Sequence, residues 1–203
     1  MRVGILGAGM VGQALAAKLR ELGHTVAIGT RTPREDAVSY ADAAESAELV
    51  INATGGLVAL DVLAAAGSEN LAGKVLIDVS NPLDASQGFP PRVAIADGDS
   101  IGERIQRAYP EARVVKALNT VNAVVMVDPA GVPGDHVLFV CGDDDDAKAQ
   151  VVELLGTFGW PADRIVDLGD ITGARATEQY LVLWLRLLAQ LGTPRFNITL
   201  NQA

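Results

Sequence analysis

A glycine-rich hexapeptide near the start of the chain limits the fold more than any other feature. The run Gly7-Ala8-Gly9-Met10-Val11-Gly12 follows the apolar residues 3–6 and begins an alanine- and leucine-rich stretch over residues 10–22. In this G-x-G-x-x-G pattern the first glycine permits a tight turn, the second admits a pyrophosphate and the third allows close helix packing. The amides of the helix N-terminus then face the anion. The pattern predicts a dinucleotide site, and the alternative is a glycine-rich turn in an ordinary α/β domain.

Strand-like and helix-like runs alternate along most of the chain. Short apolar runs predict strands at residues 3–6, 25–29, 49–53, 74–79, 112–118 and 136–141. Longer runs predict helices at residues 10–22, 33–44, 57–66 and 100–108, and a further helix whose start carries residues 143–146. Crossovers of this length predict a doubly wound, mostly parallel α/β sheet of the Rossmann type.

The end of the chain departs from this pattern. It predicts a short strand at residues 164–168, a helix at residues 174–191 and a terminal strand at residues 196–200. A length of 203 residues fits one domain, without the helical domain of ~100 residues that many dehydrogenases add. We therefore expect residues 1–203 to form one Rossmann domain, with a C-terminal helical extension from about residue 170. Residues 81–93 hold three prolines and are expected to be mobile or to line the site.

The residues after the second expected strand indicate which nicotinamide cofactor binds. Enzymes that use NAD usually place a carboxylate there to accept from the ribose 2′-hydroxyl, whereas a 2′-phosphate favours a cation and hydroxyl donors. The chain reads Gly29-Thr30-Arg31-Thr32-Pro33-Arg34, and its first carboxylate is Glu35. We interpret Thr30 and Arg31 as a phosphate clamp, so the expected cofactor is NADP(H). Arg34 is either part of this clamp or a solvated loop residue.

Three expected strands end in asparagine, at Asn52, Asn81 and Asn119. Ligands of open α/β sheets bind outside the carboxyl ends of the strands. We therefore interpret the three asparagines as the lining of a pocket for the nicotinamide amide and a polar acceptor. Asparagine also favours turns for local reasons, which is the alternative explanation of each one.

Few titratable side chains are expected at these strand ends. His24 and His136 are expected away from the site, and among the lysines only Lys116 lies near the strand ends. The acidic run from Asp143 to Asp146 is interpreted as helix capping and not as a metal site. No catalytic residue is assigned and no metal is expected. Oxidation of an alcohol needs a general acid or base, whereas a flavin-like ring accepts hydride at one atom with less help.

Composition excludes several classes of partner. The net charge is −9 and aromatic residues make up 4%, which disfavours nucleic-acid binding. Cys141 stands alone, so we expect neither an intrachain disulfide nor a thiolate zinc site, and a cytoplasmic location. Residues 3–17 faintly resemble a signal peptide without a cleavage site, and residues 181–191 are too short to span a membrane. The expected partner is a small redox acceptor.

The chain resembles the NADP oxidoreductases that depend on the deazaflavin coenzyme F420, and also the cytoplasmic NADPH domain of the STEAP metalloreductases. The similarity covers nearly the whole chain. It is carried by five segments, Gly4-Ile5-Leu6-Gly7-Ala8-Gly9, Gly29-Thr30-Arg31, Asp78-Val79-Ser80-Asn81-Pro82, Val115-Lys116-Ala117-Leu118-Asn119-Thr120 and Cys141-Gly142-Asp143-Asp144.

The resemblance implies a role for each matching segment. The glycine loop would bind pyrophosphate, and Thr30 and Arg31 would hold the 2′-phosphate. Ala53, Thr54 and Gly55 would contact the nicotinamide half of the cofactor. Asn81, Pro82 and Asn119 would border the ring. We accordingly expect the acceptor between Asn81 and Pro82 on one side and Asn119 and Thr120 on the other.

The leading hypothesis is hydride exchange between NADP(H) and a deazaflavin or flavin-like acceptor. One alternative keeps the enzyme class but changes the acceptor, to ferric complexes through free flavin or to an imine. The other is a sensor that binds NADP(H) without turnover.

Two apolar stripes on the last expected helix indicate a homodimer. Leu181, Leu185 and Leu188 form one stripe, and Tyr180, Trp184, Leu187 and Leu191 form a second one beside it. One sheet face cannot easily cover both stripes, so we expect a twofold partner to bury the uncovered one. The alternative is that residues 81–93 or 121–132 cover it within the chain.

Overall fold

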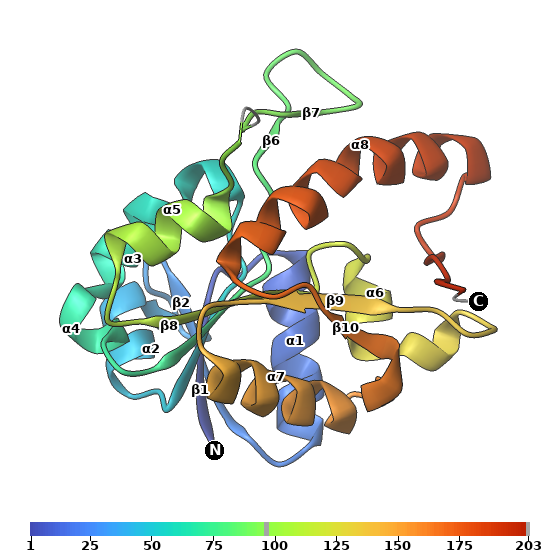
Figure 1. Ribbon diagram of the computed structural model, residues 1–203. Helices are drawn as coiled ribbons and strands as arrows, with labels where there is room; N and C mark the ends of the chain where they lie inside the picture. The colour runs from blue at the N-terminus through green and yellow to red at the C-terminus, as the bar shows by residue number, and fades with distance from the viewer. Residues whose placement is uncertain (96–97, 202–203) are drawn as a thin grey trace.

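A central β-sheet with helices on both faces forms the protein (Figure 1); the computed structural model describes residues 1–95 and 98–201. The strands of the sheet are β1 (Arg2–Leu6), β2 (Thr25–Thr30), β3 (Val38–Ser39), β4 (Leu49–Asn52), β5 (Val75–Asp78), β8 (Arg113–Ala117), β9 (Leu138–Cys141) and β10 (Ile165–Asp167). Their order is β10-β9-β8-β5-β4-β1-β2-β3. Neighbouring strands pair in parallel except β8 and β9, which are antiparallel. The prediction of a doubly wound, mostly parallel sheet is confirmed.

Helices cover the sheet in two groups. One face carries α1 (Met10–Glu21), α6 (Ala123–Val127) and α7 (Asp145–Thr157). The other carries α2 (Tyr40–Glu45), α3 (Ala59–Ala66), α4 (Ser68–Leu71) and α5 (Ile101–Ala108). The long helix α8 (Ala174–Leu191) lies over the carboxyl ends of the strands, beside the small hairpin of β6 (Leu83–Asp84) and β7 (Arg92–Val93) (Figure 1). In the described part of the chain, no helix has the length and apolarity that crossing a bilayer requires.

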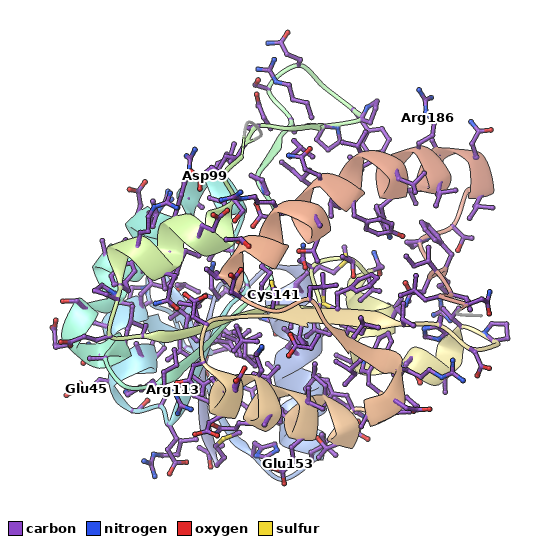
Figure 2. All side chains as sticks on the ribbon, viewed as in Figure 1. Glu45, Asp99, Arg113, Cys141, Glu153 and Arg186 are labelled. Carbon is purple, nitrogen blue, oxygen red and sulfur yellow. The ribbon has the colours of Figure 1, made fainter. Side chains whose placement is uncertain are left out.

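Alternating side chains along each central strand build both cores. Leu49 and Ile51 of β4 pack toward α1 and α7, whereas Val50 between them packs toward α2 and α3. Strands that are buried on both faces read as continuous apolar runs, which explains why these runs are visible in the sequence. Cys141 lies buried near the middle of the molecule (Figure 2).

Ligands are expected to bind where the neighbouring strands β1 and β4 meet, because the order of the strands reverses there. From β1 the chain winds through β2 and β3 toward one edge of the sheet, and from β4 it winds through β5 and β8 toward the other. The crevice at such a reversal, outside the carboxyl ends, is the usual ligand site of a doubly wound sheet.

The helix predicted at residues 33–44 is the main error in secondary structure. Backbone hydrogen bonds in both directions between Arg34 and Ala37 close a tight turn there. The helix starts only at Tyr40, where the Ser39 side chain accepts from the Asp42 amide. Pro33 indicated a first turn, but the real helix-capping residue is six positions later.

The terminal strand is a further prediction that is wrong. Residues 196–200 do not form a strand; they attach to the sheet through the Val137 amide, which donates to the Ile198 carbonyl. Residues 81–93 include a hairpin, and two of them, Asn81 and Leu83, line a pocket, as one of the two expectations for this segment had it. Just beyond the hairpin, Gln179 of α8 donates to the Ile95 carbonyl at 2.7 Å. The capping interpretation of the acidic run is confirmed, because Asp144 accepts from the Ala147 amide at 2.8 Å.

The two apolar stripes of α8 are largely covered within the chain. Leu181 and Leu185 are buried, and the Trp184 ring stacks on Phe196 with centroids 5.4 Å apart. The expectation of one wholly uncovered stripe is therefore wrong. The C-terminal segment packs on Trp184, and β7 and residues 121–126 also lie against the buried side of α8, as the alternative of cover within the chain supposed. The apolar side chains that α8 exposes are those of Val182, Leu183 and Leu191.

Candidate cofactor and acceptor site

The glycine-rich turn leaves an open space in front of α1. Gly7 has a φ of +115°, and a Cβ there would lie 2.7 Å from the Ala53 carbonyl oxygen. A Cβ on Gly12 would lie 2.0 Å from the Gly7 carbonyl oxygen, whereas a Cβ on Gly9 would meet nothing within 4 Å. Gly9 precedes the helix without a side-chain cap, and the first turn carries no acidic residue. The helix amides therefore face a space that an anion can enter.

The polar residues after β2 differ in whether other residues of the chain already form hydrogen bonds or ion pairs with them. The Thr30 hydroxyl donates to the Thr32 carbonyl at 2.9 Å. Arg34 donates to Asp36 at 2.7 Å on the surface. Arg31 is exposed, and among the described residues it forms no ion pair. Arg31 is thus the more available of the two arginines for an anionic ligand.

Asn52 holds the turn after β4 and does not line the pocket. It is fully buried, and its Nδ2 donates to Asp78 Oδ1 at 2.8 Å. Its Oδ1 accepts from the Thr54 hydroxyl at 2.6 Å. The interpretation of Asn52 as a lining residue is therefore wrong, because Asp78 of the neighbouring strand β5 binds one end of its amide and Thr54 of the following turn binds the other. It acts through the turn, from which Ala53, Thr54 and Gly55 line the pocket.

Asn81 and Asn119 meet across the ends of β5 and β8. Asn81 Nδ2 donates to the Asn119 carbonyl at 2.7 Å, and Asn119 Nδ2 donates to Asn81 Oδ1 at 3.0 Å. Leu118 has a φ of +63°, a conformation that costs a residue other than glycine about 1–3 kcal/mol. Asn119 Oδ1 is buried without a partner among the described residues. The backbone thus holds a polar side chain in place with one acceptor unused.

The predicted asparagine pair and the glycine turn border one pocket of about 290 Å³. Its walls are Met10, Val11, Ala53, Thr54, Gly55, Val79, Ser80, Asn81, Leu83, Asn119, Thr120, Val121, Asn122, Ala123, Met126, Leu181 and Trp184. None of these lining residues has an ionisable side chain. Leu181 and Trp184 come from α8 and were not expected here, because helical spacing alone marks them as core or interface residues. Pro82 is a turn residue whose carbonyl accepts from the Ala94 amide.

A buried ion network lies behind the pocket. Lys116, predicted only to lie near the strand ends, is fully buried, and its ammonium contacts Asp78 at 2.7 Å and Glu178 at 2.8 Å. It also donates to the Ser80 carbonyl at 2.6 Å. Burial lowers the pKa of Lys116, but the two carboxylates outweigh it and raise the pKa above its usual value. Removing one partner from such a buried group costs about 3–5 kcal/mol.

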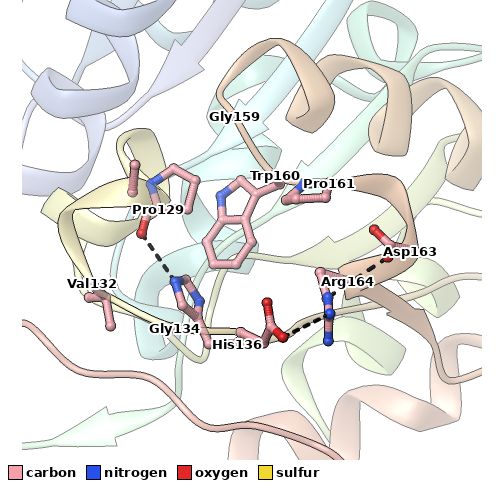
Figure 3. A pocket seen from close by; sticks show the side chains of 11 residues that line it. Pro129, Val132, Gly134, His136, Gly159, Trp160, Pro161, Asp163 and Arg164 are labelled. Atoms are coloured by element: carbon pink, nitrogen blue, oxygen red, sulfur yellow. Dashed lines mark hydrogen bonds and ion pairs between the residues drawn. The ribbon is translucent and has the colours of Figure 1, made fainter.

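A larger pocket of about 440 Å³ lies elsewhere, between the segment after α6 and the segment after α7 (Figure 3). Its polar groups are already paired. His136 meets the Pro129 carbonyl at 3.1 Å through one ring nitrogen and Asn197 at 3.0 Å through the other. Arg164 contacts Asp135 at 3.1 Å. This pocket lies away from the glycine turn, so the smaller one is the better candidate.

Sequence comparison relates the first part of the chain to a family of known proteins. Residues 2–82 match the family described as NADP oxidoreductase, coenzyme F420-dependent. The matched region contains the glycine turn, Thr30, Arg31, the turn after β4 and Asn81. Metalloreductase STEAP3 of Rattus norvegicus is 30% identical in an alignment of 202 residues, which covers 95% of this chain and 38% of that protein. The chain therefore spans well under half the length of this curated relative.

Solved structures resemble the whole chain. A protein from Arthrobacter sp. FB24, described as a candidate F420-dependent NADP reductase, is 47% identical, with a TM-score of 0.95 and 100% of both chains covered. An imine reductase from Streptomyces aurantiacus is 21% identical, with a TM-score of 0.65 over 95% of this chain and 64% of that one. The second likeness concerns the fold alone.

Proposed function

Because the chain belongs to the family of coenzyme F420-dependent NADP oxidoreductases, we propose that it exchanges hydride between NADP(H) and a deazaflavin or flavin-like acceptor. The observation that carries this proposal is the lining of the 290 Å³ pocket. The pocket adjoins the glycine turn and has amide, hydroxyl and apolar side chains but no ionisable one. Such a site suits a reaction that needs two rings to be held in contact more than it needs a proton to be moved.

The residues at the glycine turn fit NADP(H). The amides at the start of α1 would hold the pyrophosphate, and the open space at Gly9 admits it. Arg31 and Thr30 would hold the 2′-phosphate, with Arg34 beside them. Ala53 to Gly55, Asn81 and Pro82 would border the nicotinamide. When bound, NADPH supplies the hydride.

The acceptor would enter from the side of Asn119 and Thr120. Asn119 Oδ1 can accept a hydrogen bond from an N–H group of a bound ring, because no described residue uses this oxygen. Leu181 and Trp184 would exclude water from one side of the ring. A flavin-like ring takes hydride at one atom and can obtain its proton from water, so the missing general acid is no obstacle.

The same lining disfavours carbonyl and imine acceptors. Reduction of a carbonyl requires a proton donor near the reacting heteroatom, and a neutral imine likewise needs a proton. The pocket walls supply hydroxyl and amide groups for that role, which are poor acids. Reduction of ferric complexes through free flavin remains compatible with the site, since flavin would accept the hydride.

We further propose that two copies of the chain associate through α8. The volume of about 290 Å³ is at the lower end for small-molecule sites, so one subunit encloses an acceptor only in part. Val182 and Leu183 expose 61% and 53% of their surface on α8, and Phe89 exposes 72% on the neighbouring hairpin loop. A second subunit that covers these side chains would bury the exposed face of α8, the helix that also carries Leu181 and Trp184 of the pocket wall.

Light scattering tests the dimer. We expect a mass of about twice 21.1 kDa, and a return to 21.1 kDa when Val182 and Leu183 are both changed to Asp. Val38→Asp, at an exposed apolar residue on the far edge of the sheet, is the control and should keep the larger mass. A wild-type mass of 21.1 kDa at every concentration contradicts the dimer.

A panel of acceptors tests the reaction. NADPH absorbance is followed with coenzyme F420, free flavins, ferric complexes with flavin, and cyclic imines. We expect turnover with the deazaflavin or with a flavin. Saturable binding of NADPH without turnover of any acceptor would identify a sensor instead, and turnover of the imines alone would identify the other enzyme class.

A further inference from the structure

The buried network of Asp78, Lys116 and Glu178 joins three separate parts of the fold. Asp78 ends β5, Lys116 lies on β8 and Glu178 lies on α8. The three ammonium protons of Lys116 have three acceptors: Asp78 Oδ2 at 2.7 Å, the Ser80 carbonyl at 2.6 Å and Glu178 Oε1 at 2.8 Å. The side chains are 0% to 1% exposed. No solvent screens these contacts, so the geometry of one group fixes that of the others.

Two backbone amides stabilise the carboxylate of Glu178, which is the second negative charge of the network. Glu178 accepts from the Ile101 amide at 2.9 Å and from the Gly102 amide at 3.1 Å, both in the first turn of α5. The N-terminal amides of a helix carry partial positive charge, so this turn stabilises a carboxylate. Glu178 thereby joins α8 to α5 as well as to β8.

Asp78 and Glu178, the two carboxylates of the network, are each connected to residues that line the acceptor pocket. Asp78 Oδ1 accepts from the Ser80 amide at 3.2 Å, and Ser80 and Asn81 form one wall. On α8, Leu181 and Trp184 are three and six residues after Glu178, and they form another wall of the same pocket. The network therefore links two walls of the pocket, although none of its three side chains lines the pocket.

We propose that the Asp78, Lys116 and Glu178 network is a positioning device that sets the distance between the Asn81 wall and the Trp184 wall of the acceptor pocket. The proposal rests on the proposed function for the identity of the acceptor, but not for the mechanical linkage itself. A displaced α8 would loosen the acceptor, whereas the glycine turn and Arg31, which do not contact the network, would still bind NADPH.

The variant Glu178→Gln tests the linkage, because glutamine keeps the shape but loses the charge and one acceptor. We expect the KM for the acceptor to rise about tenfold with the Kd for NADPH unchanged. Lys116→Met should act in the same direction. If Glu178→Gln does not fold by circular dichroism, Glu178→Asp keeps the charge and tests the length of the linkage instead.

Glu103→Gln is the matched control. Glu103 is also a buried carboxylate that joins α5 to α8, through Arg175 at 2.8 Å, but among the described residues it forms no hydrogen bond or ion pair with β5 or β8. This variant should leave the KM for the acceptor at the wild-type value.

A second readout does not depend on turnover. In a Trp160→Phe background, Trp184 is the single tryptophan, and its quenching by acrylamide reports how closely the wall is packed. We expect quenching to increase in Glu178→Gln and Lys116→Met but not in Glu103→Gln. Unchanged quenching in a folded Glu178→Gln protein overturns the proposal, even if no acceptor is turned over by the wild type. Increased quenching without acceptor turnover supports the linkage and counts against the proposed function alone.

Discussion

Asn81 and Asn119 hold each other across the ends of β5 and β8, through one contact of 2.7 Å and another of 3.0 Å, and leave Asn119 Oδ1 unused among the described residues. The pair is a polar edge of the 290 Å³ pocket in which we propose that the acceptor binds. Its side chains are far apart in sequence, so each looks like a turn residue when taken alone.

Replacing Asn119 with Leu should impair acceptor turnover more than NADPH binding. The change removes the unused oxygen and the donor to Asn81, and we expect a loss of about 1–3 kcal/mol in kcat/KM for the acceptor. Steady-state kinetics with each substrate varied in turn measure the split. Wild-type values for both substrates would mean that the acceptor binds elsewhere and that the asparagines are turn residues.

Replacing Arg31 with Glu should abolish the preference for NADPH over NADH. The change removes a charge-assisted contact with the 2′-phosphate and adds repulsion, at a cost of roughly 2–4 kcal/mol in NADPH binding. Arg34→Glu is the control, because Arg34 already pairs with Asp36 and should matter less. Calorimetric titration with both cofactors measures the effect, and equal affinities in the wild type contradict the phosphate clamp.

Two glycine substitutions should separate binding from folding. A Cβ at Gly9 meets no atom of the chain, so Gly9→Ala should keep the thermal midpoint while weakening NADPH binding at least about tenfold. A Cβ at Gly12 would lie 2.0 Å from the Gly7 carbonyl oxygen, so Gly12→Ala should lower the thermal midpoint itself. Full NADPH affinity in Gly9→Ala would contradict a pyrophosphate at this turn.

The ion pair of Asp144 and Arg113 should make stability depend on acid pH. The Arg113 hydrogen bond, with help from the Ala147 amide, lowers the pKa of Asp144 to about 2. A carboxylate with a lowered pKa stabilises the folded state above its ordinary pKa of 3.8, and this contribution is lost as the pH falls toward 2. Asp144→Asn keeps the helix cap but should reduce the loss of stability between these pH values. Denaturant unfolding at several pH values measures it, with exposed Asp146→Asn as the control; equal pH dependence in Asp144→Asn and wild type would contradict the assignment.

The sheet could be predicted from sequence because its physical cause is local. Strands such as β4 and β5 are buried on both faces, so they appear as apolar runs between turn residues. The helix α8 was predicted with the bounds that the structure has, because an 18-residue periodic run leaves little ambiguity. The false helix at residues 33–44 came from Pro33, which is compatible with a helix start but also with the turn that Arg34 and Ala37 close.

Of the candidate site, only the residues at the carboxyl ends of the strands could be predicted from the sequence. Asn81 and Asn119 were identified because parallel strands bring their carboxyl ends to one edge. Asn52 was assigned wrongly because its partner, Asp78, lies 26 residues away on the neighbouring strand. Glu178 and the Trp184 wall could not be inferred, since the return of α8 over the sheet is a tertiary contact that no local pattern encodes.

Single-turnover mixing of the NADPH complex with oxidised coenzyme F420 tests the account most directly. NADPH absorbance and deazaflavin absorbance should fall together in equal amounts, and deuterium at the transferred position of NADPH should slow both. Loss of neither signal, with NADPH shown to be bound, would contradict the proposed hydride exchange with a deazaflavin.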